Sequence, residues 1–173
     1  MKNNFLFFAI EGNDFDGHNF IEDAISNGST TIVCTKLPSN LEENISYLLV
    51  EDIRESVYNI SSNFYGNPDK KIKIIAVTGT NGKTSIVYFL YQFFKSLDIK
   101  VGMLSTIENR IGDKVLNAKL TTPNPVEFLR ILNDMVLSNC QYCFMEASSH
   151  AIHQKRIVRS EERRVGKECP LLC

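Results

Sequence analysis

The sequence predicts an α/β protein with two domains. Apolar, β-branched runs of strand length alternate along its 173 residues with segments whose apolar residues recur at helical spacing. A glycine-rich loop, at 78–84, lies between one such strand and one such helix. A turn-rich break, YGNPDK, divides the chain. We therefore expect a small α/β domain over 1–66, a linker over 67–71, and a second α/β domain with a parallel sheet over 72–158.

In the first domain, strand patterns alternate with helical patterns. The apolar run at 5–10 predicts a strand, and 19–27 predicts a helix that ends at Gly28. Two short apolar runs, at 30–34 and 47–50, predict further strands.

A helix that Asp52 caps is expected to close this domain, with apolar residues at helical spacing as far as Phe64. The elements expected in the second domain are a strand at 72–77, a helix carrying Ile86 to Leu97, a strand at 100–106, a hairpin around Gly112, a helix from Pro125 to Leu137 and a strand at 141–145.

The loop at 78–84 reads TGTNGKT and has the chemistry of a phosphate site. Its glycines let backbone N–H groups face an anion, and the helix that follows adds the positive end of its dipole. Lys83 would place a charge on the outer phosphates, and the Thr84 hydroxyl could ligate magnesium. Val77 stands where the strict P-loop pattern has glycine, so this is a shorter form. The alternative is a glycine-rich turn in a fold that binds no nucleotide.

Glu146 follows the apolar strand at 141–145, as Thr78 follows the strand before the glycine loop. Ligands of open α/β sheets gather at the carboxyl ends of the strands. An acidic residue there suits a magnesium ligand or a group that orients water. The alternative is a helix cap, with Ser148 or Ser149 as the capping residue.

Composition excludes several classes of protein. The net charge of −1 gives no basic excess for binding nucleic acid, and no run approaches the length of a membrane span. Five cysteines are an odd number without the spacing of a secreted scaffold, which favours a reducing, cytoplasmic setting. Cys140 and Cys143 form a C-x-x-C pair, which we interpret as structural, with Cys143 in the core of a strand.

Three segments in this order, TGTNGKT, TTP and EASSHAIHQKR, resemble the Mur ligases, and most closely the MurE type, the UDP-N-acetylmuramoyl-L-alanyl-D-glutamate–amino acid ligases. The segment FFAIEGNDFDGHNFIEDAISNG is similar to the uridine-nucleotide-binding domain of that type. The resemblance runs from Asn4 to Ile157. It implies that 1–66 is this uridine-nucleotide-binding domain, without its start, and that 72–158 is the first part of a P-loop-type ATPase domain whose parallel sheet is incomplete.

The resemblance also implies a role for particular residues. The ATP phosphate loop would consist of Gly79, Thr80, Asn81, Gly82, Lys83, Thr84 and Ser85. Lys83 and Glu146 would be catalytic, and Thr84 and Glu146 would contact magnesium. The uridine nucleotide would contact Asn13, Asp14 and Phe15. The muramoyl peptide would contact Thr121, Thr122, Ser148, Gln154 and Arg156, the last of which suits an anionic substrate because a guanidinium binds carboxylate or phosphate bidentately.

The implied reaction uses ATP and Mg²⁺. ATP phosphorylates the side-chain carboxylate of the substrate's D-glutamate, and the amine of a free amino acid, meso-diaminopimelate or L-lysine, attacks the acyl phosphate. The substrates would be the only partners, with no nucleic acid or membrane, and the protein would be a monomer. Two alternatives stay open: another ligase of the superfamily, such as a folylpolyglutamate synthase, and a plain P-loop ATPase or nucleotide-binding module.

Departures from the family pattern predict a chain truncated at both ends and inactive as a ligase. The family's D-S-R-x-V segment before the first strand, its second-magnesium lysine and its amino-acid-selecting domain have no counterpart here. The segment at 159–173 is densely charged and aperiodic, and we interpret it as a non-native or disordered tail.

Overall fold

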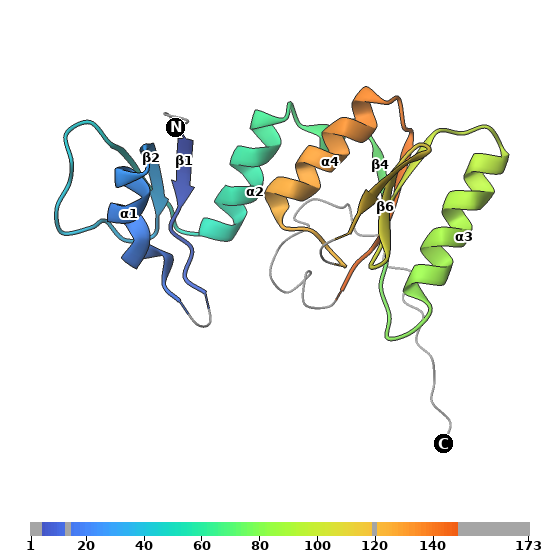
Figure 1. Cartoon of the computed structure of the whole chain (residues 1–173), viewed down its shortest axis with the longest axis horizontal. Coiled ribbons are helices and arrows are strands. Elements are labelled where there is room, and N and C mark those ends of the chain that lie inside the picture. The colour runs from blue at the N-terminus through green and yellow to red at the C-terminus, as the bar shows by residue number, and fades with distance from the viewer. Residues whose placement is uncertain (1–4, 13–14, 119–120, 149–173) are drawn as a thin grey trace, which may run out of the picture. The chain divides into compact units, whose positions relative to one another are not determined.

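A computed structural model of the chain describes residues 5–12, 15–118 and 121–148. The chain divides into two units, 1–57 and 58–173, and the division falls within one helix, α2 (Ile53–Phe64). Figure 1 follows the chain through both units, with strands and helices alternating as expected of an α/β protein.

The first unit is a three-stranded parallel sheet in the order β1-β2-β3. Its elements are β1 (Phe5–Phe8), η1 (Gly17–Phe20), α1 (Ile21–Ser26), β2 (Ser29–Cys34) and β3 (Ser46–Leu49). The helix expected at 19–27 therefore starts as a 3₁₀ turn and continues as α1. Its buried face packs Ile21 against Ile32 and Cys34 of β2 and against Ala9, which follows β1, forming the core of this unit.

The start of η1 is fixed by its N-cap Asp16 and its first two residues, Gly17 and His18. The Asp16 carboxylate accepts hydrogen bonds from the backbone N–H of His18 (2.9 Å) and from its ring Nδ1 (2.6 Å). The backbone N–H of Thr35, just after β2, donates to His18 Nε2 at 3.3 Å. Since Nε2 accepts, the proton of a neutral ring is on Nδ1, facing Asp16. The imidazole of His18 thus connects the start of η1 to the end of β2 through hydrogen bonds.

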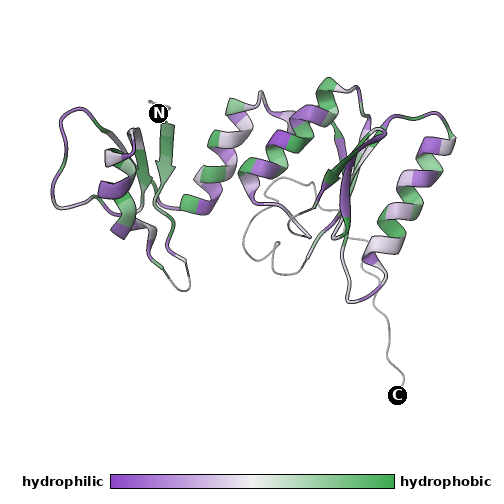
Figure 2. Cartoon of the chain, in the orientation of Figure 1, coloured by the Kyte–Doolittle hydropathy of each residue, from purple (hydrophilic) through white to green (hydrophobic). Residues whose placement is uncertain are grey.

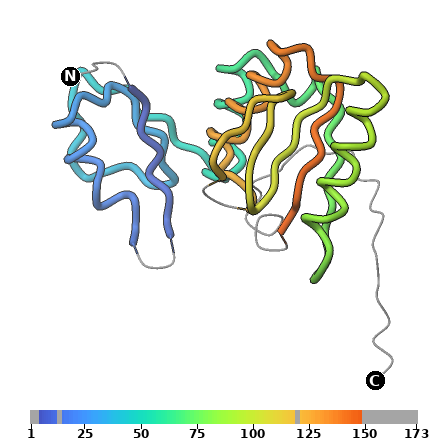
Figure 3. Tube along the Cα trace, turned by 45° about the vertical axis from the view of Figure 1, so that its right-hand side comes forward, coloured from blue at the N-terminus to red at the C-terminus, as the bar shows by residue number. Residues whose placement is uncertain are grey.

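The second unit has a five-stranded sheet in the order β4-β8-β5-β6-β7. Its strands are β4 (Lys73–Val77), β5 (Val101–Leu104), β6 (Glu108–Ile111), β7 (Lys114–Asn117) and β8 (Tyr142–Glu146). β4 and β5 both pair in parallel with β8, whereas β6 and β7 form an antiparallel hairpin beside β5. Figure 3 shows this yellow hairpin on one side of β5 and the orange-red β8 on the other. The expected parallel sheet is present, and the hairpin extends it with antiparallel strands.

Helices cover both faces of this sheet (Figure 1). On one face, α4 (Pro125–Leu137) packs Phe128, Leu132 and Met135 into a core that also takes Tyr58 of α2. On the other face lies α3 (Lys83–Ser96). Local sequence sets where α4 begins. Pro125 occupies the first turn, where its missing N–H costs nothing, and the Asn124 side chain caps the backbone N–H of Glu127 at 2.9 Å.

Fewer residues of α3 are buried than its apolar residues would suggest. Val87 and Tyr91 are fully buried, and Tyr91 also donates its hydroxyl proton to the carbonyl of Gly112 at 2.8 Å. Phe89 and Phe93 stack on each other but stay 67% and 48% exposed. Figure 2 shows hydrophobic colour on more than one side of this helix. No helix among the residues that the structure describes is long and apolar enough to span a membrane.

The predicted linker residues are joined to α2 by hydrogen bonds. Asp69, in the short helix η2 (Pro68–Lys70), accepts from the hydroxyl of Tyr58 at 3.1 Å and from Ser62 Oγ at 2.7 Å. This part of the break therefore packs with the second unit.

The expectation that Cys143 is a core residue of a strand is confirmed, since it is fully buried in β8. Burial raises the pKa of the Cys143 thiol and of the Cys140 thiol, because a low-dielectric surrounding disfavours the thiolate. We therefore expect both to resist iodoacetamide at pH 8 in the folded chain and to react once it is denatured. Peptide mass spectrometry measures this, and rapid labelling of Cys143 in the folded chain would contradict its placement in the core.

Candidate functional site

The glycine loop joins the end of β4 to the start of α3, as the sequence predicted. Gly79 and Gly82 have positive φ angles of 146° and 79°, which side-chain-bearing residues rarely adopt. Gly82 is also the N-cap of α3 and offers no side-chain acceptor to the first turn. The first backbone N–H groups of α3 therefore have no N-cap side chain to which they can donate, and the helix dipole makes this end attractive to an anion.

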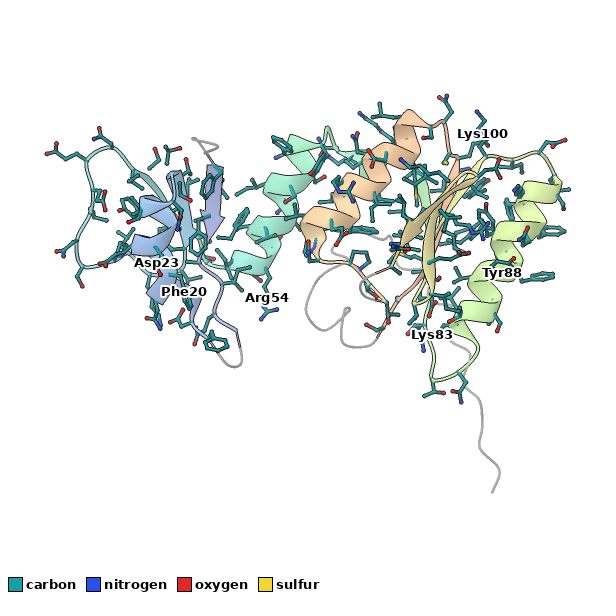
Figure 4. The ribbon with its side chains drawn as sticks, in the orientation of Figure 1. Phe20, Asp23, Arg54, Lys83, Tyr88 and Lys100 are labelled. Carbon is teal, nitrogen blue, oxygen red and sulfur yellow. The ribbon has the colours of Figure 1, made fainter. Side chains whose placement is uncertain are left out.

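Lys83 turns its ammonium group back over this loop. Its Nζ donates to the carbonyl of Gly79 at 2.7 Å and to that of Thr80 at 3.2 Å. Figure 4 shows Lys83 at the loop end of α3, at the opposite end of the sheet from Lys100. Thr84 and Ser85 follow in the first turn of the helix. The first turn of α3 thus carries one positive charge and two hydroxyl groups at the helix terminus.

Glu146 ends the strand next to the one that precedes the loop. It is in register with Val77, and the N–H of Ala147 donates to the Val77 carbonyl at 2.9 Å. The Glu146 side chain is 1% exposed, yet no lysine or arginine among the described residues forms an ion pair with it. Its Oε1 accepts from the backbone N–H of Thr106 at 2.8 Å, and its Oε2 from the Thr106 hydroxyl at 3.1 Å. Within residues 5–148, as far as the structure describes them, the hydrogen bonds to this carboxylate come from neutral donors.

Threonines link three loops around this carboxylate. Thr122 Oγ1 donates to the backbone carbonyl of Glu146 at 3.1 Å and accepts from the N–H of Ser148 at 3.4 Å. Thr106 Oγ1 lies 3.2 Å from Thr121 Oγ1. The loops after β5, before α4 and after β8 thus meet at the carboxyl edge of the sheet, where ligands of such folds bind.

Sequence reasoning missed Thr106, which it counted within a strand. The strand β5 ends at Leu104, so Thr106 lies in the loop beyond it. Its position at the carboxyl end of a predicted parallel strand was the available signal. The neighbouring Ser105 shapes this loop, because its Oγ donates to the carbonyl of Glu108 at 2.7 Å and accepts from the Glu108 N–H at 3.2 Å.

The other predicted substrate contacts belong to the first unit or lie outside the described residues. Phe15 belongs to the first unit and is 74% exposed. Asn13, Asp14, Gln154 and Arg156 lie outside the described residues.

The donor set at this edge fits magnesium bound together with a nucleotide. Magnesium is commonly held by one or two carboxylates plus substrate phosphates and water. Glu146 supplies one carboxylate and Thr84 one hydroxyl, from adjacent parts of the sheet edge. No group of three or more His, Cys, Asp or Glu that could hold a metal occurs among the described residues. The phosphates of a bound nucleotide would have to supply the remaining ligands.

A hollow of about 620 Å³ in the described part of the chain lies elsewhere. It is lined by Lys70, Lys71 and Lys73 near the start of β4, with Cys140 before β8. It is open to solvent and lies at the amino ends of these strands. We place the candidate site at the carboxyl edge instead, because the glycine loop and the buried carboxylate are there.

Two protein families match this chain. The family described as "Mur ligase family, catalytic domain" matches residues 1–74, and the "Mur ligase middle domain" matches residues 77–162. A UDP-N-acetylmuramoyl-L-alanyl-D-glutamate–2,6-diaminopimelate ligase of Cytophaga hutchinsonii is 46% identical over 153 residues, which make up 88% of this chain and 32% of the relative. The protein with the same name from Bacteroides fragilis is 44% identical over 152 residues, 88% of this chain and 31% of the relative. The chain thus spans about a third of the length of these relatives.

Solved structures share the fold. A UDP-N-acetylmuramoyl-L-alanyl-D-glutamate–2,6-diaminopimelate ligase superposes with a TM-score of 0.72 at 23% identity, covering 90% of this chain and 31% of that one. The MurF ligase from Thermotoga maritima, solved in complex with ADP, gives 0.54 at 22% identity, covering 86% of this chain and 30% of that one. At these identities the likeness concerns the fold alone, and it confirms the expected α/β class.

Proposed function

The chain belongs to the Mur ligase family, and on that premise we propose for it the activity of an ATP-dependent amide ligase of peptidoglycan precursor synthesis. The amide would join an amino acid to the D-glutamate of UDP-N-acetylmuramoyl-L-alanyl-D-glutamate. The observation that carries the proposal is the buried Glu146 carboxylate on the strand beside the glycine loop, which forms no ion pair with a lysine or arginine of the described residues.

We propose that different groups of the site bind the phosphates of the nucleotide and its magnesium ion. Backbone N–H groups of Gly79 to Ser85 and the start of α3 would bind the phosphate oxygens. Lys83, whose ammonium now bonds to two loop carbonyls, would exchange these acceptors for phosphate oxygens. Thr84 and Glu146 would hold Mg²⁺. When bound, this ion would neutralise the charge of the phosphates so that an anionic carboxylate can approach.

At the acceptor side, we propose that Thr121, Thr122 and Ser148 contact the muramoyl peptide. Thr121 and Ser148 are half-buried beside Glu146, which would bring the D-glutamate carboxylate close to the outer phosphate. Gln154 and Arg156, and Asn13 to Phe15 for the uridine nucleotide, are proposed on the family resemblance. The carboxylate would take the outer phosphoryl group from ATP, and the amine would then displace phosphate from this acyl phosphate.

The amino acid that we propose is diaminopimelate, because the relatives from Cytophaga hutchinsonii and Bacteroides fragilis are named for that substrate. L-Lysine is the competing acceptor. We also propose that the protein is a cytoplasmic monomer. The described cysteines, Cys34, Cys140 and Cys143, are all free and buried, which supports a reducing compartment.

The test is a phosphate-release assay with ATP, Mg²⁺, UDP-N-acetylmuramoyl-L-Ala-D-Glu and either diaminopimelate or lysine. It is run on the 173-residue chain and on a version extended at both ends from the flanking reading frame. We expect diaminopimelate-dependent release from the extended version. Release with lysine alone would overturn the proposed acceptor, and release that needs neither the dipeptide nor an amino acid would indicate a plain ATPase.

A further inference from the structure

Thr106 contacts both oxygens of the buried Glu146 carboxylate, one through its backbone N–H and the other through its hydroxyl. We propose that Thr106 is a positioning residue: it fixes the rotation of this carboxylate toward nucleotide-bound magnesium and connects it to Thr121. The inference rests on the proposed function, because it assigns to Thr106 the orientation of a proposed metal ligand.

The hydrogen-bond chain runs from Glu146 through the Thr106 hydroxyl to Thr121. A threonine hydroxyl carries one proton, and an ionised carboxylate can only accept. The Thr106 proton therefore goes to Glu146 Oε2, 3.1 Å away. Thr106 Oγ1 is also 3.2 Å from Thr121 Oγ1. The Thr106 hydroxyl therefore connects the buried carboxylate with the loop before α4.

The exposure of the two side chains indicates a positioning role. Glu146 is 1% exposed, whereas Thr106 is exposed and could satisfy its hydroxyl with water. Instead it donates to the carboxylate. Hydrogen bonds to both oxygens restrict the rotation of the carboxylate. Hydrogen-bond partners of metal-binding side chains commonly fix the orientation of those side chains in this way. A group ordered in advance of binding loses less entropy when the ion arrives.

The side-chain contribution can be separated from the backbone contribution. Thr106→Val keeps the β-branched shape and the backbone N–H to Oε1 but removes the donor to Oε2. Thr106→Ser restores that donor. Because Thr106 is exposed, we expect both variants to have the thermal midpoint of the parent chain.

The experiment measures by calorimetry the affinity of the 173-residue chain for β,γ-imido-ATP, with Mg²⁺ and with EDTA. The readout is the ratio of the two affinities, because damage to the phosphate loop lowers both whereas a misoriented Glu146 lowers only the first. Loss of an outer-shell partner typically costs 10–100-fold in metal affinity. With the backbone bond retained, we expect Thr106→Val to reduce the ratio about tenfold. Thr106→Ser should keep the parent ratio, as should Thr31→Val in the first unit.

Three results would overturn the inference. A parent chain that gains no affinity from Mg²⁺ overturns it together with the proposed magnesium site. A parent that does gain affinity, with an unchanged ratio in Thr106→Val, overturns the positioning role alone. Equal losses in Thr106→Val and Thr106→Ser would assign the effect to side-chain shape and not to the hydroxyl.

Discussion

Replacing Lys83 by alanine is expected to weaken ATP–Mg²⁺ binding by roughly ten- to hundredfold. A hydrogen bond to a charged group contributes about 1.5–3 kcal/mol, and each 1.4 kcal/mol is a factor of ten in affinity. In the structure, Lys83 Nζ already crosses the loop to the carbonyls of Gly79 and Thr80. The ammonium group is therefore held where the phosphates would lie, and little ordering of the side chain remains when ATP binds.

The folded state should tolerate this change. Lys83 is not buried, and its contacts are to an exposed loop. The matched control is Lys100→Ala, which removes the same charge at the other end of the sheet (Figure 4). Titration calorimetry of both variants measures the difference. Equal affinities in Lys83→Ala and Lys100→Ala would rule out a phosphate loop at 79–85.

Gly17→Ala is expected to destabilise the first unit strongly. A Cβ atom at this position would lie 2.5 Å from the backbone N of Ile10 and 2.6 Å from its O. Backbone cannot move aside as the end of a flexible side chain can, and the N–H of Gly17 also donates to that carbonyl at 2.9 Å. Overpacking of a well-packed site costs about 1–3 kcal/mol, and occasionally more. We expect at least the upper part of this range.

The measurement is hydrogen exchange followed by mass spectrometry, which resolves the two units separately. Amides of β1 and β2 should exchange much faster in Gly17→Ala, and those of β5 and β8 at the parent rate. Asn19→Ala is the control, since this exposed side chain lies in the same turn. Unchanged protection of β1 would show that the turn can absorb a methyl group, and that glycine is not required between Asp16 and His18.

Features that depend on a few consecutive residues could be predicted from the sequence. Asp52 accepts from the N–H groups of Arg54 and Glu55, each at 3.0 Å, and so starts α2 where the sequence indicated. The glycine loop between β4 and α3 also depends on consecutive residues, since Gly79 and Gly82 adopt the positive φ angles that it requires. Alternating strands and helices, the caps and this loop fix the fold class, because hydrogen bonds between near neighbours and the spacing of apolar residues determine each element locally.

Only the tertiary structure shows which side chains are buried and which residues distant in sequence contact each other. Phe89 and Phe93 have the same spacing as the buried residues of α3 but face away from the sheet, whereas Tyr91 is buried. Thr106 bonds to a carboxylate forty positions along the chain, because β5 and β8 are neighbours in the sheet. Strand order and helix orientation reduce the apolar surface that the whole unit exposes to water. Residues far apart in the sequence contribute to this buried area. Local sequence therefore determined the elements and the loop, and long-range packing determined which side chains meet at Glu146.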